Sequence, residues 1–249
     1  MTYPVLVRGL TKTFYDESRG EIRAVDGIDF ECCEGEVFGL LGANGAGKTT
    51  TLRMLSTILT PTSGSAAIFN HDVVTDPEGV RKHLGFYSAS TALYPRLTAR
   101  ETIDFFARIN QYPSNRVPER VRYLVDRFGL SKYADVRVEK LSTGMKQKVS
   151  LARTVAHDPP IIIFDEPTVG LDVLNALEAQ QTIKELRDEG KTIIFSTHIM
   201  SEAERICDRI AIIHGGRILD CDTLAGLREK TGKHYLEDIF VQYVGGPAA

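Results

Sequence analysis

Long hydrophobic runs are missing from this 249-residue sequence. No apolar stretch approaches the roughly 18–20 residues that a helix needs to cross a bilayer. No apolar stretch follows a basic segment near the N-terminus either, so we expect no signal peptide. If the protein works at a membrane, another polypeptide must therefore cross it.

The sequence also has few cysteines and only a small excess of charge of one sign. None of the 4 cysteines belongs to a Cys-x-x-Cys pair or accompanies a histidine cluster, which argues against a zinc site. We expect the adjacent Cys32 and Cys33 to act as small apolar residues in a reduced, cytosolic protein. The formal net charge of -3 gives no basic field, so we expect no nucleic-acid partner.

What the sequence does contain is an alternation of strand and helix patterns. Residues 37–41, 161–164 and 192–196 are short apolar runs, typical of strands that are buried on both faces of a parallel sheet. Between the last two runs, the sequence predicts a helix that Asp172 caps and Gly190 ends, which completes a strand–helix–strand unit.

Two further regions differ from this parallel pattern. Residues 5–7 and 28–31 alternate as antiparallel strands do. From about residue 94 to 158 the pattern is mostly helical, with a capping box at residues 98–101 and a helix predicted over 121–128. Pro113 and Pro118 are interpreted as the borders of a loop before that helix.

A glycine-rich loop follows the first buried strand. Residues 42–49, Gly-Ala-Asn-Gly-Ala-Gly-Lys-Thr, match G-x-x-x-x-G-K-[ST] between a predicted strand and a predicted helix. Glycines allow successive N–H groups to point at phosphate oxygens, and the helix N-terminus adds partial positive charge. Lys48 is predicted to reach the β- and γ-phosphates, and the Thr49 hydroxyl to bind Mg²⁺. The predicted nucleotide contacts in this loop are Gly42, Asn44, Gly45, Ala46, Gly47, Lys48, Thr49 and Thr50.

Two carboxylates and a histidine follow the later strands. Asp165 ends an apolar run, where it can reach Mg²⁺, and Glu166 can polarise the attacking water as a general base. The sequence Asp-Glu-Pro could instead merely end a strand, but the phosphate loop elsewhere favours catalysis. His198 follows the next strand, whose carboxyl end lies at the same sheet edge. We predict Lys48, Glu166 and His198 as catalytic residues, and Thr49 and Asp165 as metal ligands.

A second phosphate-facing surface is predicted at residues 141–145, Leu-Ser-Thr-Gly-Met. Ser142 and Gly144 stand at the start of a predicted helix, whose N–H groups suit an anion. One subunit already has a phosphate site, so this surface needs the nucleotide of a partner. The two motifs together predict a dimer with nucleotide between its subunits.

Together these motifs resemble the ATP-binding subunit of an ABC transporter over nearly the whole chain. Residues 42–49 resemble its Walker A, 141–145 its signature, 161–166 its Walker B and 170–172 its D-loop, with His198 as the switch histidine. The resemblance implies ATP and Mg²⁺ as cofactors. It also implies that Ser142, Gly144 and Asp172 contact nucleotide and that Phe14 stacks on adenine, with Tyr15 as the close alternative and core packing as a rival for either.

The resemblance also implies an α/β fold with a P-loop (RecA-like), mainly parallel sheet core, an N-terminal antiparallel β subdomain and an inserted α-helical lobe. A single ABC ATPase domain would span residues 1–249, with its catalytic core in 1–92 and 159–249 and the lobe in 93–158. On binding ATP it would form a homodimer, or a dimer with a related ATPase subunit. Its other partner would be a transmembrane permease, which would place the chain peripherally on the cytoplasmic face of the cell membrane.

Three residues depart from the common pattern of that family. Thr143 and Met145 stand where the commonest signature has Gly and Gln, and the Met-Lys-Gln-Lys version resembles ABC-2 exporters, including sodium-efflux ATPases. Ala89 stands where the Q-loop usually ends in Gln, and alanine cannot bind Mg²⁺ or orient water. Ser88, Ser90 or a water could substitute for it.

The segment after the Q-loop borders the permease groove in that family. Tyr94 and Arg96 would suit such an interface, although an ordinary capped loop explains the segment equally well. The leading hypothesis is therefore an ATPase that energises efflux, with Na⁺ as one candidate cargo. The alternative is the same ATPase core acting as a nucleic-acid or ribosome clamp. A GTPase or small-molecule kinase is a third class, but the guanine-reading Asn-Lys-x-Asp pattern is absent.

Overall fold

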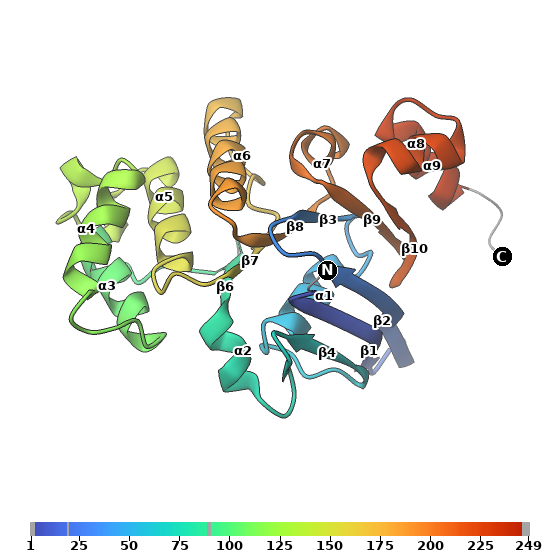
Figure 1. Ribbon diagram of the computed structural model, residues 1–249, viewed down its shortest axis with the longest axis horizontal. Coiled ribbons are helices and arrows are strands. Elements are labelled where there is room, and N and C mark those ends of the chain that lie inside the picture. Colours follow the sequence, from blue (N-terminus) through green and yellow to red (C-terminus); the bar gives the residue numbers. More distant parts are fainter. Residues whose placement is uncertain (1–2, 19, 89–90, 246–249) are drawn as a thin grey trace.

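The computed structural model describes residues 3–18, 20–88 and 91–245, and a six-stranded sheet runs through the centre of this part of the chain (Figure 1). Its strand order is β10-β9-β3-β8-β7-β6. The five strands from β9 to β6 are parallel, and β10 runs antiparallel to β9 at one edge. The strands are β3 (Val37–Leu41), β6 (Leu84–Ser88), β7 (Ile161–Asp165), β8 (Thr192–Thr197), β9 (Arg209–His214) and β10 (Arg217–Asp222).

A second, antiparallel sheet lies below the first in Figure 1, with the order β2-β1-β4-β5. It contains β1 (Val5–Asp16), β2 (Gly20–Cys32), β4 (Ser63–Ile68) and β5 (His71–Asp72). Phe30 of β2 stacks on Phe38 of β3, with ring centroids 5.0 Å apart, so the two sheets share one hydrophobic core. Helix α1 (Lys48–Leu55) joins the same core through Leu52 and Leu55, both fully buried.

The central strands are apolar throughout because they are buried on both faces. In β7, Ile161 and Ile163 belong to the core shared with the antiparallel sheet, whereas Ile162 and Phe164 belong to the core on the opposite face. Helix α6 (Val173–Asp188) covers that opposite face. The sequence prediction of two-sided burial from continuous apolar runs is confirmed.

The helical region lies at one side of the sheet, at the left of Figure 1. It contains α3 (Ala99–Ile109), α4 (Val117–Arg127), two short 3₁₀ segments (Ser131–Tyr133 and Val138–Lys140) and α5 (Thr143–Thr154). Ile103, Leu124 and Val149, one from each helix, are fully buried together. The fold class is therefore as expected, while the domain boundaries at residues 93 and 158 stay a prediction.

Local signals for the helices are confirmed with one correction. At the start of α3, Glu101 N donates to Thr98 Oγ1 at 3.1 Å and Thr98 N donates to Glu101 Oε2 at 2.8 Å, which completes the predicted capping box. The expected loop across Pro118 is wrong, because α4 begins at Val117 and Pro118 stands in its first turn. A proline there removes an N–H that has no helical partner in any case.

The remaining helices pack on other parts of the two sheets. Helix α2 (Pro77–His83) follows the antiparallel sheet, and α7 (Met200–Ile206), α8 (Leu224–Thr231) and α9 (Leu236–Gly245) lie above the main sheet in Figure 1. The C-terminal helix α9 packs back onto the protein through Leu236 and Ile239. None of the helices in the described ranges is long and apolar enough to cross a membrane.

Candidate functional site

The glycine-rich loop connects β3 to α1 at the carboxyl edge of the main sheet. Two of its glycines are required by close backbone contacts. A Cβ atom on Gly42 would lie 2.3 Å from the Ile213 carbonyl oxygen, and one on Gly47 would lie 2.5 Å from the Ala24 carbonyl oxygen. Gly47 also has φ of +109°, which side chains disfavour. The loop is therefore compact, with Asn44 and Gly45 exposed, and its contacts with a nucleotide stay a prediction.

Lys48, Glu166 and His198 meet at this edge of the sheet. The Lys48 ammonium is 4% exposed and donates to the carbonyl oxygens of Gly42 at 2.7 Å and Ala43 at 3.1 Å. It also pairs with Glu166 Oε1 at 3.2 Å. The same carboxylate oxygen lies 3.3 Å from His198 Nδ1. The three residues predicted as catalytic therefore share one carboxylate-centred cluster.

Thr49 and Asp165 form a second cluster beside the first. The Thr49 hydroxyl donates to Asp165 Oδ1 at 3.1 Å, and Asp165 is 4% exposed at the end of β7. The Ser88 hydroxyl, at the end of β6, lies 3.5 Å from Asp165 Oδ2. Ser88 therefore faces the predicted metal ligand, whereas Ala89 and Ser90 lie outside the described residues.

Strand order explains why these residues converge. The parallel register places Leu41 beside Thr197 and Asp165 beside Ser196, so the ends of β3, β8 and β7 are level. The residues that follow each strand therefore reach the same edge, which is where open α/β sheets bind ligands.

Sequence reasoning missed one polar residue at this edge. The Ser196 hydroxyl donates to Asp165 Oδ1 at 2.8 Å and accepts from the Glu166 backbone N–H at 3.1 Å. The signal was a lone serine at the end of an apolar strand, but only the register with β7 shows that it stands beside Asp165.

The predicted second phosphate surface begins α5. The Ser142 side chain is exposed and accepts from Met145 N at 3.3 Å, so Ser142 caps the helix. Gly144 is close to α6, because a Cβ atom on it would lie 3.0 Å from Asn175 Oδ1. Within the described residues, no hydrogen bond or ion pair joins Ser142 or Gly144 to residues 42–49.

Asp172 hydrogen-bonds to a nearby residue of its own helix, Asn175. Its carboxylate caps α6 and accepts from Asn175 N at 3.0 Å and from the Asn175 side-chain amide. These hydrogen bonds hold the pKa of Asp172 below its usual range. Asn175 in turn packs against Gly144, which links the start of α6 to the start of α5. The nucleotide role of Asp172 stays a prediction.

The two candidates for stacking on adenine lie near the end of β1. Phe14 is 40% exposed, with the Lys12 ammonium 5.3 Å from its ring centroid, and Tyr15 is 82% exposed. Core packing is therefore wrong for both residues. Both rings are exposed, and the choice between them stays a prediction.

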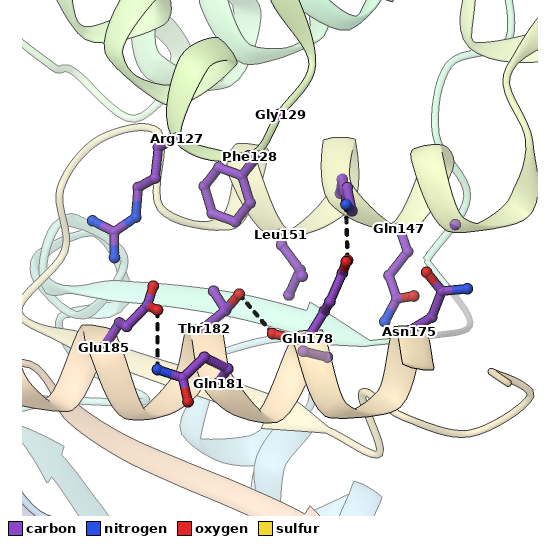
Figure 2. A pocket seen from close by; sticks show the side chains of 13 residues that line it. Arg127, Phe128, Gly129, Gln147, Leu151, Asn175, Glu178, Gln181, Thr182 and Glu185 are labelled. Atoms are coloured by element: carbon purple, nitrogen blue, oxygen red, sulfur yellow. Dashed lines mark hydrogen bonds and ion pairs between the residues drawn. The ribbon is translucent and has the colours of Figure 1, made fainter. Parts of the chain in front are cut away.

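A groove lined by both polar and apolar side chains separates the helical region from α6 (Figure 2). It has a volume of about 330 Å³ and runs between the end of α4, one face of α5 and the exposed face of α6. Two ion pairs lie in or beside it. Lys148 of α5 lies 2.8 Å from Glu178 of α6, and Arg127 at the end of α4 lies 2.7 Å from Glu189, just beyond α6. The Lys148–Glu178 pair therefore lies within the groove, which the apolar side chains of Phe128, Leu151 and Ala179 also line.

Comparisons with known proteins agree with the geometry. The family model described as "ABC transporter" matches residues 25–169, which is more than half of the chain. The ATP-binding protein NatA of Bacillus subtilis is 38% identical over 91% of this chain and 93% of its own length. The daunorubicin/doxorubicin resistance ATP-binding protein DrrA of Streptomyces peucetius is 36% identical over 86% of this chain and 65% of its own length.

Solved structures give the same result. The ATP binding subunit of an ABC transporter superimposes with a TM-score of 0.87 at 28% identity, over 98% of this chain and 100% of that one. An ATP-binding cassette, solved as a dimer in a post-hydrolysis state with ADP and Pi, superimposes with a TM-score of 0.79 at 27% identity, over 88% of this chain and 98% of that one. Matching motifs, fold and relatives lead to one conclusion: this chain belongs to the ABC transporter family and is an ATP-binding, ATP-hydrolysing protein of that family.

Proposed function

We propose that this chain is the ATPase subunit of an exporter and energises efflux through a separate transmembrane permease. The observation that carries the ATPase part is the placement of the Glu166 carboxylate between Lys48 and His198, next to the Asp165–Thr49 pair. A base, a phosphate-binding cation and a pair of oxygen ligands at one helix N-terminus are the parts that phosphoryl transfer to water requires.

The residues at the end of β7 and the start of α1 fit Mg²⁺. Thr49 and Asp165 supply a hydroxyl and a carboxylate oxygen from two rigid elements, and hard oxygen ligands are those that Mg²⁺ prefers. When bound, the ion would neutralise negative charge on the phosphate oxygens. Lys48 and the amides of the glycine-rich loop would hold the β- and γ-phosphates.

Glu166 would act as the general base on the attacking water. Its carboxylate is paired with Lys48 at 3.2 Å, and a γ-phosphate that draws this ammonium away would free the carboxylate to turn to water. His198, on the other side of the same carboxylate, would then contact the γ-phosphate. The ion pair thus makes the release of the base depend on nucleotide binding.

Completion of the site would require a second subunit. Ser142 is exposed at the N-terminus of α5 and, among the described residues, makes no hydrogen bond or ion pair with the phosphate loop of its own chain, so it is available to a nucleotide held by a partner. Relatives of this chain have been solved as dimers. We propose that the helical lobe, residues 93–158, presents Ser142 and Gly144 to the partner's γ-phosphate, and that Asp172 joins this dimer interface.

The permease would bind beside the helical lobe and hold this chain at the cytoplasmic face of the membrane. Tyr94 is 52% exposed and packs edge-on against Phe105, which is itself 40% exposed, at 5.8 Å between centroids. Such half-exposed aromatic side chains suit a protein interface. Relatives whose names include drug resistance and Nod factor export support an export direction. Sodium ions remain one candidate cargo among several.

The test of the ATPase assignment is Glu166→Gln. We expect this variant to bind ATP, to lose about 100-fold or more of its turnover because the general base is gone, and to accumulate as an ATP-stable dimer. Glu185→Gln, an exposed carboxylate on α6, is the matched control and should keep full turnover. Unchanged steady-state turnover in Glu166→Gln would contradict the assignment of Glu166 as the general base.

The alternative function, a clamp on nucleic acid or ribosomes, is distinguished by copurification. We expect the chain to copurify with a hydrophobic permease from detergent extracts. Recovery with ribosomal RNA instead, resistant to high salt, would favour the clamp and contradict export.

A further inference from the structure

Ser196 is fully buried at the end of β8, and the parallel register places it beside Asp165 of β7. The two residues before it, Ile194 and Phe195, are apolar and equally buried. A hydroxyl in such surroundings must find hydrogen-bond partners inside the protein, because leaving it unpaired is costly.

The Ser196 hydroxyl has two such partners, and both belong to the site. Its oxygen donates to Asp165 Oδ1 at 2.8 Å and accepts from the Glu166 N–H at 3.1 Å. A hydroxyl has one proton, and neither a carboxylate nor an amide N–H can take the opposite role, so the direction of both bonds is defined. One atom therefore ties the side chain of Asp165 to the backbone of Glu166.

The backbone of Glu166 needs this support. Its φ is +48°, in the left-handed region that residues other than glycine adopt rarely. Its N–H is held from β8 alone, by the Ser196 carbonyl oxygen at 3.2 Å and by the hydroxyl. This turn of the chain is what brings the Glu166 carboxylate to Lys48 and His198.

We infer that Ser196 is a positioning residue for ATP hydrolysis. It acts through two neighbours: it sets the rotation of the Asp165 carboxylate toward Thr49, and it holds the peptide from which the Glu166 base projects. The inference rests on the proposed roles of Asp165 and Glu166. The rival explanation is that the hydroxyl only satisfies buried polar groups and stabilises the fold.

The main test compares four substitutions by their steady-state kinetics. Ser196→Ala should lower kcat about 10–100-fold, the usual effect of losing a partner that orients a metal-binding group. KM for ATP should stay within about two-fold, because the phosphate loop is intact. Ser196→Thr keeps the hydroxyl and should recover most of the turnover, whereas Ser196→Val, which has the shape of threonine without the hydroxyl, should not. Ser56→Ala removes another buried serine hydroxyl, which donates to the Leu52 carbonyl oxygen away from the site, and should leave kcat unchanged.

A second readout does not depend on turnover. Mn²⁺ binding in the presence of ADP, followed by electron paramagnetic resonance, should weaken about 10-fold in Ser196→Ala and stay unchanged in Ser56→Ala. The urea midpoint should fall in both variants, because Ser196→Ala loses two buried hydrogen bonds and Ser56→Ala loses one.

Wild-type kcat and Mn²⁺ affinity in Ser196→Ala would overturn the inference, and so would equal losses in Ser196→Thr and Ser196→Val. Should Ser196→Ala fail to fold, the threonine and valine pair decides by itself. Turnover that survives Glu166→Gln contradicts the proposed function, whereas turnover that survives Ser196→Ala, in a protein that Glu166→Gln inactivates, contradicts only the role of Ser196.

Discussion

Lys48 and Glu166 form an ion pair, with Nζ 3.2 Å from Oε1, at the centre of the phosphate site. The lysine side chain is 4% exposed and the glutamate 23%, so the carboxylate is the more accessible partner. In the proposed function both groups turn to the nucleotide, and the pair must therefore open each time ATP binds.

The first prediction concerns the cost of opening that pair. Glu166→Gln removes the anion that competes with phosphate for Lys48, so ATP affinity should rise about two- to five-fold, the range expected for a partly exposed ion pair. Equilibrium binding of a fluorescent ATP analogue without Mg²⁺ measures it, with Glu185→Gln as control. A weaker affinity in Glu166→Gln would show that the carboxylate does not compete with phosphate.

The second prediction concerns dimer formation. Ser142→Arg places a large charged side chain at the exposed start of α5, so it should block ATP-driven dimerisation and leave ATP binding to the monomer unchanged. Size-exclusion chromatography in the Glu166→Gln background measures both species. Ser114→Arg, at an exposed loop position between α3 and α4, should still dimerise. Normal dimerisation of the Ser142 variant would contradict the proposed interface.

The third prediction concerns the groove in Figure 2. Arg127 is 15% exposed and pairs with Glu189 across the boundary between α4 and α6. A double-mutant cycle with Arg127→Gln and Glu189→Gln, followed by urea unfolding, should give a coupling of about 1 kcal/mol. The Arg100–Asp135 pair, 45% and 77% exposed, should give a smaller coupling in the same cycle. Equal couplings would mean that partial burial adds nothing to the Arg127 pair.

The fourth prediction concerns pH and stability. Burial lowers the pKa of His157 from its ordinary 6.5 to about 4, and the ring keeps one hydrogen bond, to the Leu84 carbonyl oxygen at 3.2 Å. Between these values the unfolded chain binds a proton that the folded protein does not. The contribution of this pKa shift to the free energy of unfolding is therefore fully present above pH 6.5, and it is lost as the pH falls toward 4.

Urea unfolding at two pH values measures this effect. From pH 7.5 to pH 5, the share of stability lost through His157 should be about 2 kcal/mol. Because His157→Gln cannot titrate, its free energy of unfolding should fall over the same interval by about 2 kcal/mol less than that of the unmodified protein. An identical pH dependence in the two proteins would show that His157 is not the group responsible.

Much of the fold could be predicted because its signals are local. The two-sided burial of β7, the capping box at Thr98 and the Asp172 cap of α6 each depend on a few adjacent residues. Pro118 shows where such signals fail, since a proline ends a helix in its interior but is tolerated in its first turn. A proline can therefore end a helix or begin one, depending on its position, and the sequence around Pro118 did not show which applied.

By itself, the sequence determined the phosphate loop, the acidic pair at residues 165–166 and the family, because these depend on residue identity and short spacing. Tertiary structure alone decided that Glu166 pairs with Lys48, that Asn175 stands against Gly144 and that Ser196 joins Asp165 to Glu166. The physical reason is strand order. Residues far apart in the chain become neighbours only when parallel strands align in register, and no local pattern records which strand lies beside which.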